Sequence, residues 1–138
     1  MDDAAPDRTH WLELPAHRAS VRVARHTMGE HLDGWRLPAD VCANAALLLS
    51  ELATNAVLHT LSSRFLCGIG LLPGSRLRLE VHDQDATHRA PGTRTCPGPT
   101  AENGRGLLLV HEIAETWGVD RSTLTGGNAV WATLTTAV

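Results

Sequence analysis

The sequence predicts a single α+β domain in which a mixed or antiparallel sheet is covered on one face by about three helices. Three observations carry this prediction. A long run of strong helix formers occupies Ala39–His59, two pairs of strand-like runs each flank a short turn, and one Gly- and Pro-rich stretch separates the pairs. The 138 residues and the 43% hydrophobic composition suit one globular core.

The N-terminal elements have separate local signals. We expect residues 1–9 to be disordered, because they are polar and lead into no apolar run. Trp11–Leu14 is long enough for a short strand, and Ala16–Leu32 has the imperfect apolar stripe of a helix. Pro38 favours a helix start, so the second helix is predicted over Ala39–His59.

The rest of the chain contains four strand-like runs, one further helix and a long loop. Turn signals at residues 73–75 and 126–127 pair the runs into hairpins. The loop, residues 84–106, is crowded with Pro, Gly and Thr, and loops of this length inside a domain are usually functional. We therefore expect it to be a lid. The runs are Phe65–Leu72, Arg76–His82, Gly118–Leu124 and Ala129–Thr136, and the helix is Leu107–Thr116.

Composition narrows the class of function. A net charge of -3 without a Lys or Arg run gives no electrostatic signal of binding to a nucleic-acid backbone, so direct nucleic-acid binding is a minor hypothesis. Cys42, Cys67 and Cys96 lack CxxC spacing, and no uninterrupted apolar run reaches the length of a membrane span, so we expect a cytoplasmic protein with no membrane contact. Eight scattered histidines without an HExxH motif disfavour a metal hydrolase.

Polar residues recur on the apolar side of the predicted helix Ala39–His59. At about 100° per residue, Glu51, Asn55 and His59 fall on or beside the arc of Leu48 and Leu52. A hydrogen-bonded structural cluster is the simpler interpretation. Glu and Asn one turn apart, however, project together as an oxygen pair that suits a hard cation such as Mg2+, and a Glu there can accept a proton.

Two further segments carry polar groups that are suited to binding a ligand. Asp83 continues the apolar face of the run Arg76–His82, so its carboxylate is aimed at the helical layer, where it can accept a hydrogen bond from an amino group. A turn-forming Asp is an equal alternative. Gly104-Arg105-Gly106 leads into the helix at Leu107, where backbone amides and a guanidinium can bind an anion. Taken alone, a short GxG is more often a flexible loop before an ordinary helix.

Together these segments resemble the nucleotide-binding boxes of the GHKL ATPase superfamily, and most closely its anti-sigma-factor serine/threonine kinase branch. Residues 51–59, Glu-Leu-Ala-Thr-Asn-Ala-Val-Leu-His, look like the N box ExxTNAxxH. Residues 79–83 look like the strand of the first glycine box, and residues 104–107 like the second. The resemblance covers nearly the whole chain and implies the two-layer α/β sandwich of histidine-kinase-like ATPases.

The resemblance also implies a role for each matching residue. Glu51 would be the general base, Asn55 the ligand of Mg2+, and Asp83 the residue that reads adenine. Gly104 and Gly106 would cradle phosphate, with Arg105 assisting and Leu107 beginning the helix, while His59 would have a packing role. One departure is Asp85, which stands where the family usually has glycine and adds negative charge beside the expected nucleotide.

The expected function is therefore an ATP- and Mg2+-dependent serine/threonine protein kinase of anti-sigma type. By resemblance, such a kinase sequesters a sigma factor and phosphorylates an anti-anti-sigma antagonist. The alternatives are a nucleotide-regulated binding module without transfer activity and a slow ATPase of the same fold. The sequence leaves homodimer formation open.

Overall fold

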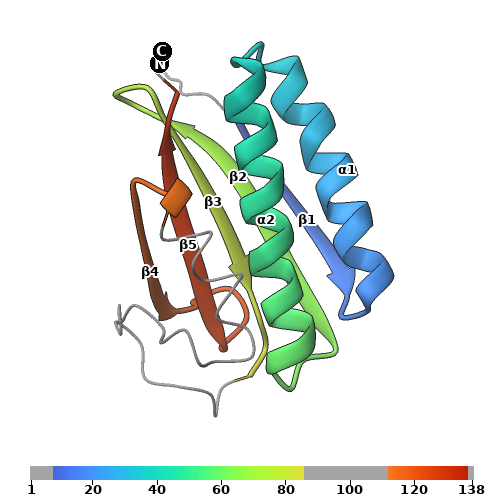
Figure 1. The fold of residues 1–138 in the computed structure, drawn as a ribbon. Helices are drawn as coiled ribbons and strands as arrows, with labels where there is room; N and C mark the ends of the chain where they lie inside the picture. Colours follow the sequence, from blue (N-terminus) through green and yellow to red (C-terminus); the bar gives the residue numbers. More distant parts are fainter. Residues whose placement is uncertain (1–7, 86–111, 137–138) are drawn as a thin grey trace.

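The computed structural model describes residues 8–85 and 112–136, which form one antiparallel five-stranded sheet in the order β1-β2-β3-β5-β4. Two helices lie side by side over one face of this sheet, as Figure 1 shows. The elements are β1 (Thr9–Pro15), α1 (Arg18–Gly34), α2 (Ala39–His59), β2 (Arg64–Leu72), β3 (Arg76–His82), β4 (Thr116–Arg121) and β5 (Asn128–Thr135).

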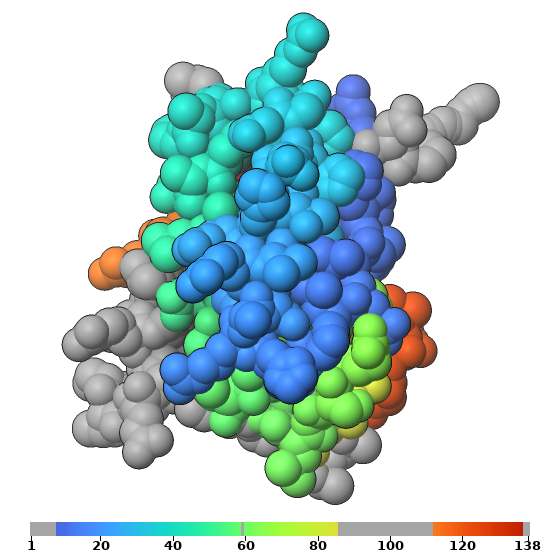
Figure 2. All heavy atoms as spheres, turned by 90° about the vertical axis from the view of Figure 1, so that its right-hand side faces the viewer, coloured from blue at the N-terminus to red at the C-terminus, as the bar shows by residue number. Residues whose placement is uncertain are grey.

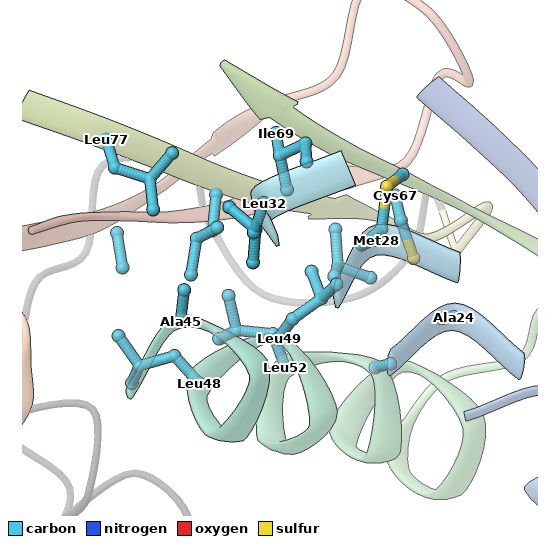
Figure 3. Packing of buried hydrophobic residues seen from close by; sticks show 14 of the residues in the cluster. Ala24, Met28, Leu32, Ala45, Leu48, Leu49, Leu52, Cys67, Ile69 and Leu77 are labelled. Atoms are coloured by element: carbon cyan, nitrogen blue, oxygen red, sulfur yellow. The ribbon is translucent and has the colours of Figure 1, made fainter. Parts of the chain in front are cut away.

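The core lies between the sheet and the helices, where the alternating pattern of β3 meets the apolar face of α2 (Figure 3). Leu77 and Leu79 are fully buried on the helical side of β3, and Leu48 of α2 is fully buried in the same cluster. Each such side chain contributes about 1.5–3 kcal/mol through burial. α1 adds Ala24, Met28 and Leu32, which recur every four residues and are all at most 1% exposed.

The α+β sandwich is confirmed, and the sheet is wholly antiparallel, which is one of the two expected forms. Some of the expected element bounds differ. Thr9, expected to be disordered, pairs with Gly70 at the start of β1. The third predicted helix lies mostly outside the described residues; residues 112–113 are helical, but Thr116 begins β4 instead of ending a helix, because it pairs with Thr133.

The ends of several elements meet at one edge of the sandwich. The C-terminal end of α2, the end of β3 and the turn between β4 and β5 all lie at the lower end of the molecule in Figure 1. This proximity follows from the antiparallel pairing of β3 with β5, which places His82 opposite Ala129. Residues distant in sequence are thereby brought to the same end of the fold.

Helix α2 is also the most apolar segment. Over Ala39–Leu58 its mean hydropathy is 1.5, so by length and composition alone it is able to cross a membrane. Here it is the central helix of the core, and it packs against the sheet on one side and against the neighbouring α1 on another (Figure 1). Because buried core helices pass the same test of length and composition, this feature is no argument for a membrane span.

Candidate functional site

Asp83 lies directly after β3 and is fixed in position by backbone groups. Its amide donates to the Asn128 carbonyl at 2.8 Å. Its Oδ1 accepts two amide hydrogen bonds, from Asp85 at 2.9 Å and from Asn128 at 3.1 Å. Among residues 8–85 and 112–136, no donor binds the other carboxylate oxygen, and the side chain is 4% exposed. The result is a pre-oriented acceptor.

The β4–β5 turn packs directly on Asp83. The Thr125 hydroxyl donates to the Asp83 carbonyl oxygen at 2.5 Å. A Cβ placed on Gly127 would press against this carbonyl oxygen and lie 2.7 Å from Asp83 Oδ1. Gly127 is therefore required for the close approach of two backbone segments. Sequence reasoning identified residues 126–127 only as a hairpin signal and missed their contact with Asp83.

Gln84 and Asp85, expected to begin the lid, are instead tied to the segment that follows α2. Gln84 Oε1 accepts bonds from the Ser63 and Arg64 amides, both at 3.0 Å. Asp85 Oδ2 accepts the Leu61 amide at 2.8 Å, and Asp85 is 6% exposed. The Asp85 carboxylate thus has a structural partner in the position where the family usually has glycine, and it holds the ends of β3 and α2 together.

Glu51 and Asn55 lie on α2 one turn apart, at the edge of its buried face. Both side chains are half-buried, whereas Leu48 and Leu52 on the expected common arc are fully buried. This agrees with the expected place of both residues on or beside the arc of Leu48 and Leu52, although neither side chain is buried as fully as those leucines. Within the described part of the chain, no hydrogen bond or ion pair joins Glu51, Asn55 and Asp83 to one another.

Glu51 opens onto a groove between α1 and α2 with a volume of about 390 Å3. Three arginines of α1 line this groove at spacings of four and three residues, which place them on one helix face. Figure 2 views the molecule from the α1 side, where this helix lies at the surface. The lining residues are Arg18, Val21, Arg22, Arg25, Ser50, Glu51, Thr54, Val57 and Leu58.

The arginine row was missed by sequence reasoning, although its signal is present in the printed sequence. Arg18, Arg22 and Arg25 share a face of α1, and the adjoining α1–α2 packing brings that face to Glu51. Guanidinium groups around a groove raise the local concentration of anions. The groove therefore suits an anionic ligand or an acidic protein segment.

Several predicted site residues lie outside the part of the chain that the structure describes. Gly104, Arg105, Gly106 and Leu107 lie outside the described residues, and so does the side chain of His59 at the end of α2. The described part of the candidate site consists of Glu51, Asn55, Asp83 and the turn that holds Asp83.

These residues fit a nucleotide better than a metal bound by protein alone. Among residues 8–85 and 112–136, no group of three His, Cys, Asp or Glu side chains could hold a metal ion. Mg2+ commonly takes one or two protein oxygens and completes its shell with phosphates and water, so the Asn55 amide oxygen is sufficient. The fixed Asp83 carboxylate matches an exocyclic amino group, and Gly127 lets the β4–β5 turn pack closely against Asp83.

Residues 14–134 match the sequence model of the histidine kinase-like ATPase domain. The chain belongs to this family. The family predicted from the N box and glycine boxes is thereby confirmed, and a family of ATPase domains implies ATP binding. No match to a curated protein was found.

Two solved structures share the histidine kinase-like ATPase fold. The RsbU and RsbW domains of Rv1364c from Mycobacterium tuberculosis superpose with a TM-score of 0.67 at 17% identity, over 92% of this chain and 31% of that chain. A blue-light activated histidine kinase domain from Erythrobacter litoralis gives a TM-score of 0.50 at 22% identity, over 89% and 62%. At these identities the likeness shows the fold alone, and this chain spans less than two thirds of either protein.

Proposed function

We propose that this chain binds ATP with Mg2+ beside the end of β3 and transfers the γ-phosphoryl group to a serine or threonine of a partner protein. The carrying observation is the Asp83 carboxylate, fixed by two amides at the same end of the sandwich as Asn55, in a chain of the histidine kinase-like ATPase family. A carboxylate bound in this way through one oxygen suits recognition of an adenine amino group through the other.

The proposal gives each described residue one task. Asp83 accepts a hydrogen bond from adenine, and the Asn55 amide oxygen binds Mg2+. ATP supplies the phosphoryl group, and Mg2+ neutralises its charge. Glu51, half-buried and at the mouth of the α1–α2 groove, accepts the proton of the attacking hydroxyl. Positioning then supplies most of the rate acceleration.

The arginine row supports a protein substrate at this site. Arg18, Arg22 and Arg25 line the groove that Glu51 enters, and their charge would draw an acidic segment or a phosphate toward the carboxylate. An ATPase that transfers phosphate only to water does not need an arginine-lined groove leading to its general base. We therefore favour phosphoryl transfer to a protein over slow hydrolysis.

The partners follow from the resemblance to anti-sigma-factor kinases. A sigma factor would be sequestered, and an anti-anti-sigma antagonist would be phosphorylated, in the cytoplasm. The structural likeness to a chain that includes an RsbW domain is compatible with this branch of the family. A homodimer is compatible with the same proposal.

Nucleotide binding is tested by calorimetric titration with ATP, with and without Mg2+. We expect Asp83→Asn to lose binding, because a donor replaces the acceptor facing adenine. Asn55→Ala should keep binding without Mg2+ but lose the gain from Mg2+. Equal affinity of Asp83→Asn and the parent chain would show that Asp83 does not read adenine.

Transfer is tested with γ-labelled ATP and a purified anti-anti-sigma protein. Label on the protein supports the kinase, free phosphate alone supports the ATPase, and binding without either supports a regulatory module. Glu51→Gln keeps the shape of the side chain but cannot accept the proton, so it should bind ATP normally and transfer at least about 100-fold more slowly. Transfer at the parent rate would refute the role of Glu51 as general base.

A further inference from the structure

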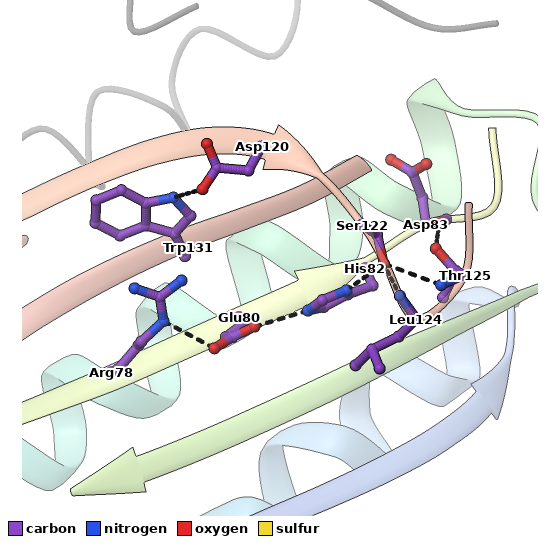
Figure 4. Close-up of polar contacts among 9 residues, drawn as sticks. All are labelled: Arg78, Glu80, His82, Asp83, Asp120, Ser122, Leu124, Thr125 and Trp131. Carbon is purple, nitrogen blue, oxygen red and sulfur yellow. Dashed lines mark hydrogen bonds and ion pairs between the residues drawn. The ribbon is translucent and has the colours of Figure 1, made fainter. Parts of the chain in front are cut away.

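A chain of side-chain hydrogen bonds runs along the sheet face opposite the helices, from β3 to the β4–β5 turn (Figure 4). Arg78 Nε donates to Glu80 Oε2 at 2.8 Å, and Glu80 Oε1 lies 2.7 Å from His82 Nε2. His82 Nδ1 lies 2.7 Å from Ser122 Oγ. His82 is 5% exposed, although it stands on the face that no described helix covers. Nothing in the proposed function uses this histidine.

The protonation state of His82 follows from the bonds of Ser122. Ser122 Oγ accepts the amides of Leu124 at 3.1 Å and Thr125 at 3.0 Å. A hydroxyl has two acceptor sites and one proton, so with both sites occupied it must donate to His82 Nδ1. The ring is therefore neutral, with its own proton on Nε2 and donated to Glu80.

Ser122 also organises the turn that holds Asp83. Its amide donates to the Gly127 carbonyl at 2.8 Å. The Gly127 amide donates to Thr125 Oγ1 at 3.1 Å, and that hydroxyl donates to the Asp83 carbonyl oxygen. The bonds thus continue from His82 on the outer face to the backbone of Asp83, whose carboxylate points away from the His82 ring in Figure 4.

We propose that neutral His82 is a positioning residue that holds the β4–β5 turn and Asp83 in the nucleotide-binding geometry, and that its protonation weakens nucleotide binding. This inference rests on the proposed function of Asp83. A proton on Nδ1 would face the Ser122 hydroxyl proton. Ser122 would have to rotate and accept from the ring, and it would then release one of the two turn amides.

The surroundings of His82 direct the effect of protonation to Ser122. On its own strand, Glu80 is its bonded partner and is joined in turn to Arg78, and the Trp11 ring covers it edge-on at 5.6 Å. Asp120 lies on the same face two strands away, where its carboxylate accepts from Trp131 Nε1. Nε2 donates to Glu80 in both protonation states. Only the bond between Nδ1 and the Ser122 hydroxyl reverses its direction, so protonation alters the hydrogen bonds of the β4–β5 turn.

The inference is tested by titrating the parent chain and His82→Asn with ADP and Mg2+ at about pH 8 and about pH 5.5, a range in which histidine is the side chain that titrates. An asparagine oxygen can accept the Ser122 proton but cannot be protonated in this range. We expect the parent to lose about five- to tenfold more affinity on acidification than His82→Asn, which corresponds to one hydrogen bond. Protonation of ADP itself affects both proteins equally.

The same pH dependence in both proteins would overturn the proposal. Nitrogen-15 NMR of the nucleotide-free chain separates this failure from a failure of the proposed function. It should show a neutral ring protonated on Nε2, and the Leu124 and Thr125 amide shifts should follow its titration. If ADP does not bind at any pH, the proposed function fails. If the ring is protonated on Nδ1, or if the amide shifts of Leu124 and Thr125 do not change as the ring titrates, the inference itself is overturned. Ser122→Ala serves as the second variant and should uncouple the amides from the ring.

Discussion

Gly127→Ala should damage the candidate site through the packing of the β4–β5 turn against Asp83, without replacing any residue proposed to contact the nucleotide. An added Cβ would press on the Asp83 carbonyl oxygen and lie 2.7 Å from both Asp83 Oδ1 and the Asp85 amide nitrogen. Two of these are backbone atoms, and the third, Asp83 Oδ1, is held by two backbone amides and loses both bonds if the side chain rotates. The turn and the end of β3 must therefore separate, and the bonds from Asn128 and Thr125 to Asp83 must lengthen or break.

The magnitude can be assembled from these contacts. Overpacking of a well-packed site costs about 1–3 kcal/mol. Each hydrogen bond lost from Asp83 adds about 1 kcal/mol, and up to two bonds are at risk. We expect the free energy of unfolding to fall by about 2–5 kcal/mol. Because the same strain displaces the Asp83 carboxylate, we expect the affinity for nucleotide to fall as well.

Urea unfolding followed by circular dichroism measures the stability, and calorimetric titration with ADP measures binding. Gly29→Ala is the matched control: it lies inside α1 with nothing within 4 Å of an added Cβ, so it should stabilise the chain by about 1 kcal/mol and leave binding unchanged. If Gly127→Ala matched the parent in both measurements, the close packing of the turn against Asp83 would be refuted.

Three other substitutions or conditions test separate features. The hydrogen bond from His82 lowers the pKa of Glu80 below its ordinary 4.5, so the stability that this bond contributes is present above pH 4.5 and is lost as the pH falls below it. Glu80→Gln should therefore flatten the acid side of the curve of unfolding free energy against pH. An unchanged curve would contradict the Glu80–His82 interaction. Burial raises the pKa of Cys67 to about 12, so alkylation at about pH 8 should modify it only after unfolding, as mass spectrometry would show. Asp85→Gly should lower the free energy of unfolding by about 1–3 kcal/mol, because the Leu61 amide loses its acceptor, whereas Asp85→Asn keeps an acceptor and should lower it less. Thermal denaturation compares the two variants, and equal midpoints would contradict a stabilising Leu61–Asp85 hydrogen bond.

Local signals predicted most of the elements because their boundaries are set locally. Helix α2 and strand β3 have the predicted residues at both ends, since Pro38 opens the helix and the alternation of Arg76–His82 ends at Asp83. β1 is longer than its apolar run, Trp11–Leu14, because backbone pairing with β2 sets its ends and requires no apolar side chains. A strand boundary of this kind depends on the pairing of two segments and cannot be predicted from the sequence of either one alone.

The candidate site was predictable only where one element carries the signal. The one-turn spacing of Glu51 and Asn55 is a property of α2 alone, and so is the exit of Asp83 from β3. The groove at Glu51 depends on the packing of α1 on α2, which no helix wheel includes. In the same way, Gly127 appeared to be a turn glycine because its neighbour, Asp83, is 44 positions earlier in the sequence.

Asp85 shows why a family pattern must be read together with the packing. By resemblance, it replaces a glycine and brings negative charge toward a polyanionic ligand. In the structure, its carboxylate binds the Leu61 amide at 2.8 Å, and Gln84 beside it binds the amides of Ser63 and Arg64. The two side chains thus fasten the end of β3 to the segment after α2, which fixes Asp83 relative to the helix of Glu51 and Asn55. A glycine would leave this junction to the backbone alone, so we regard the acidic residue as a support of the site and not as a sign of its loss.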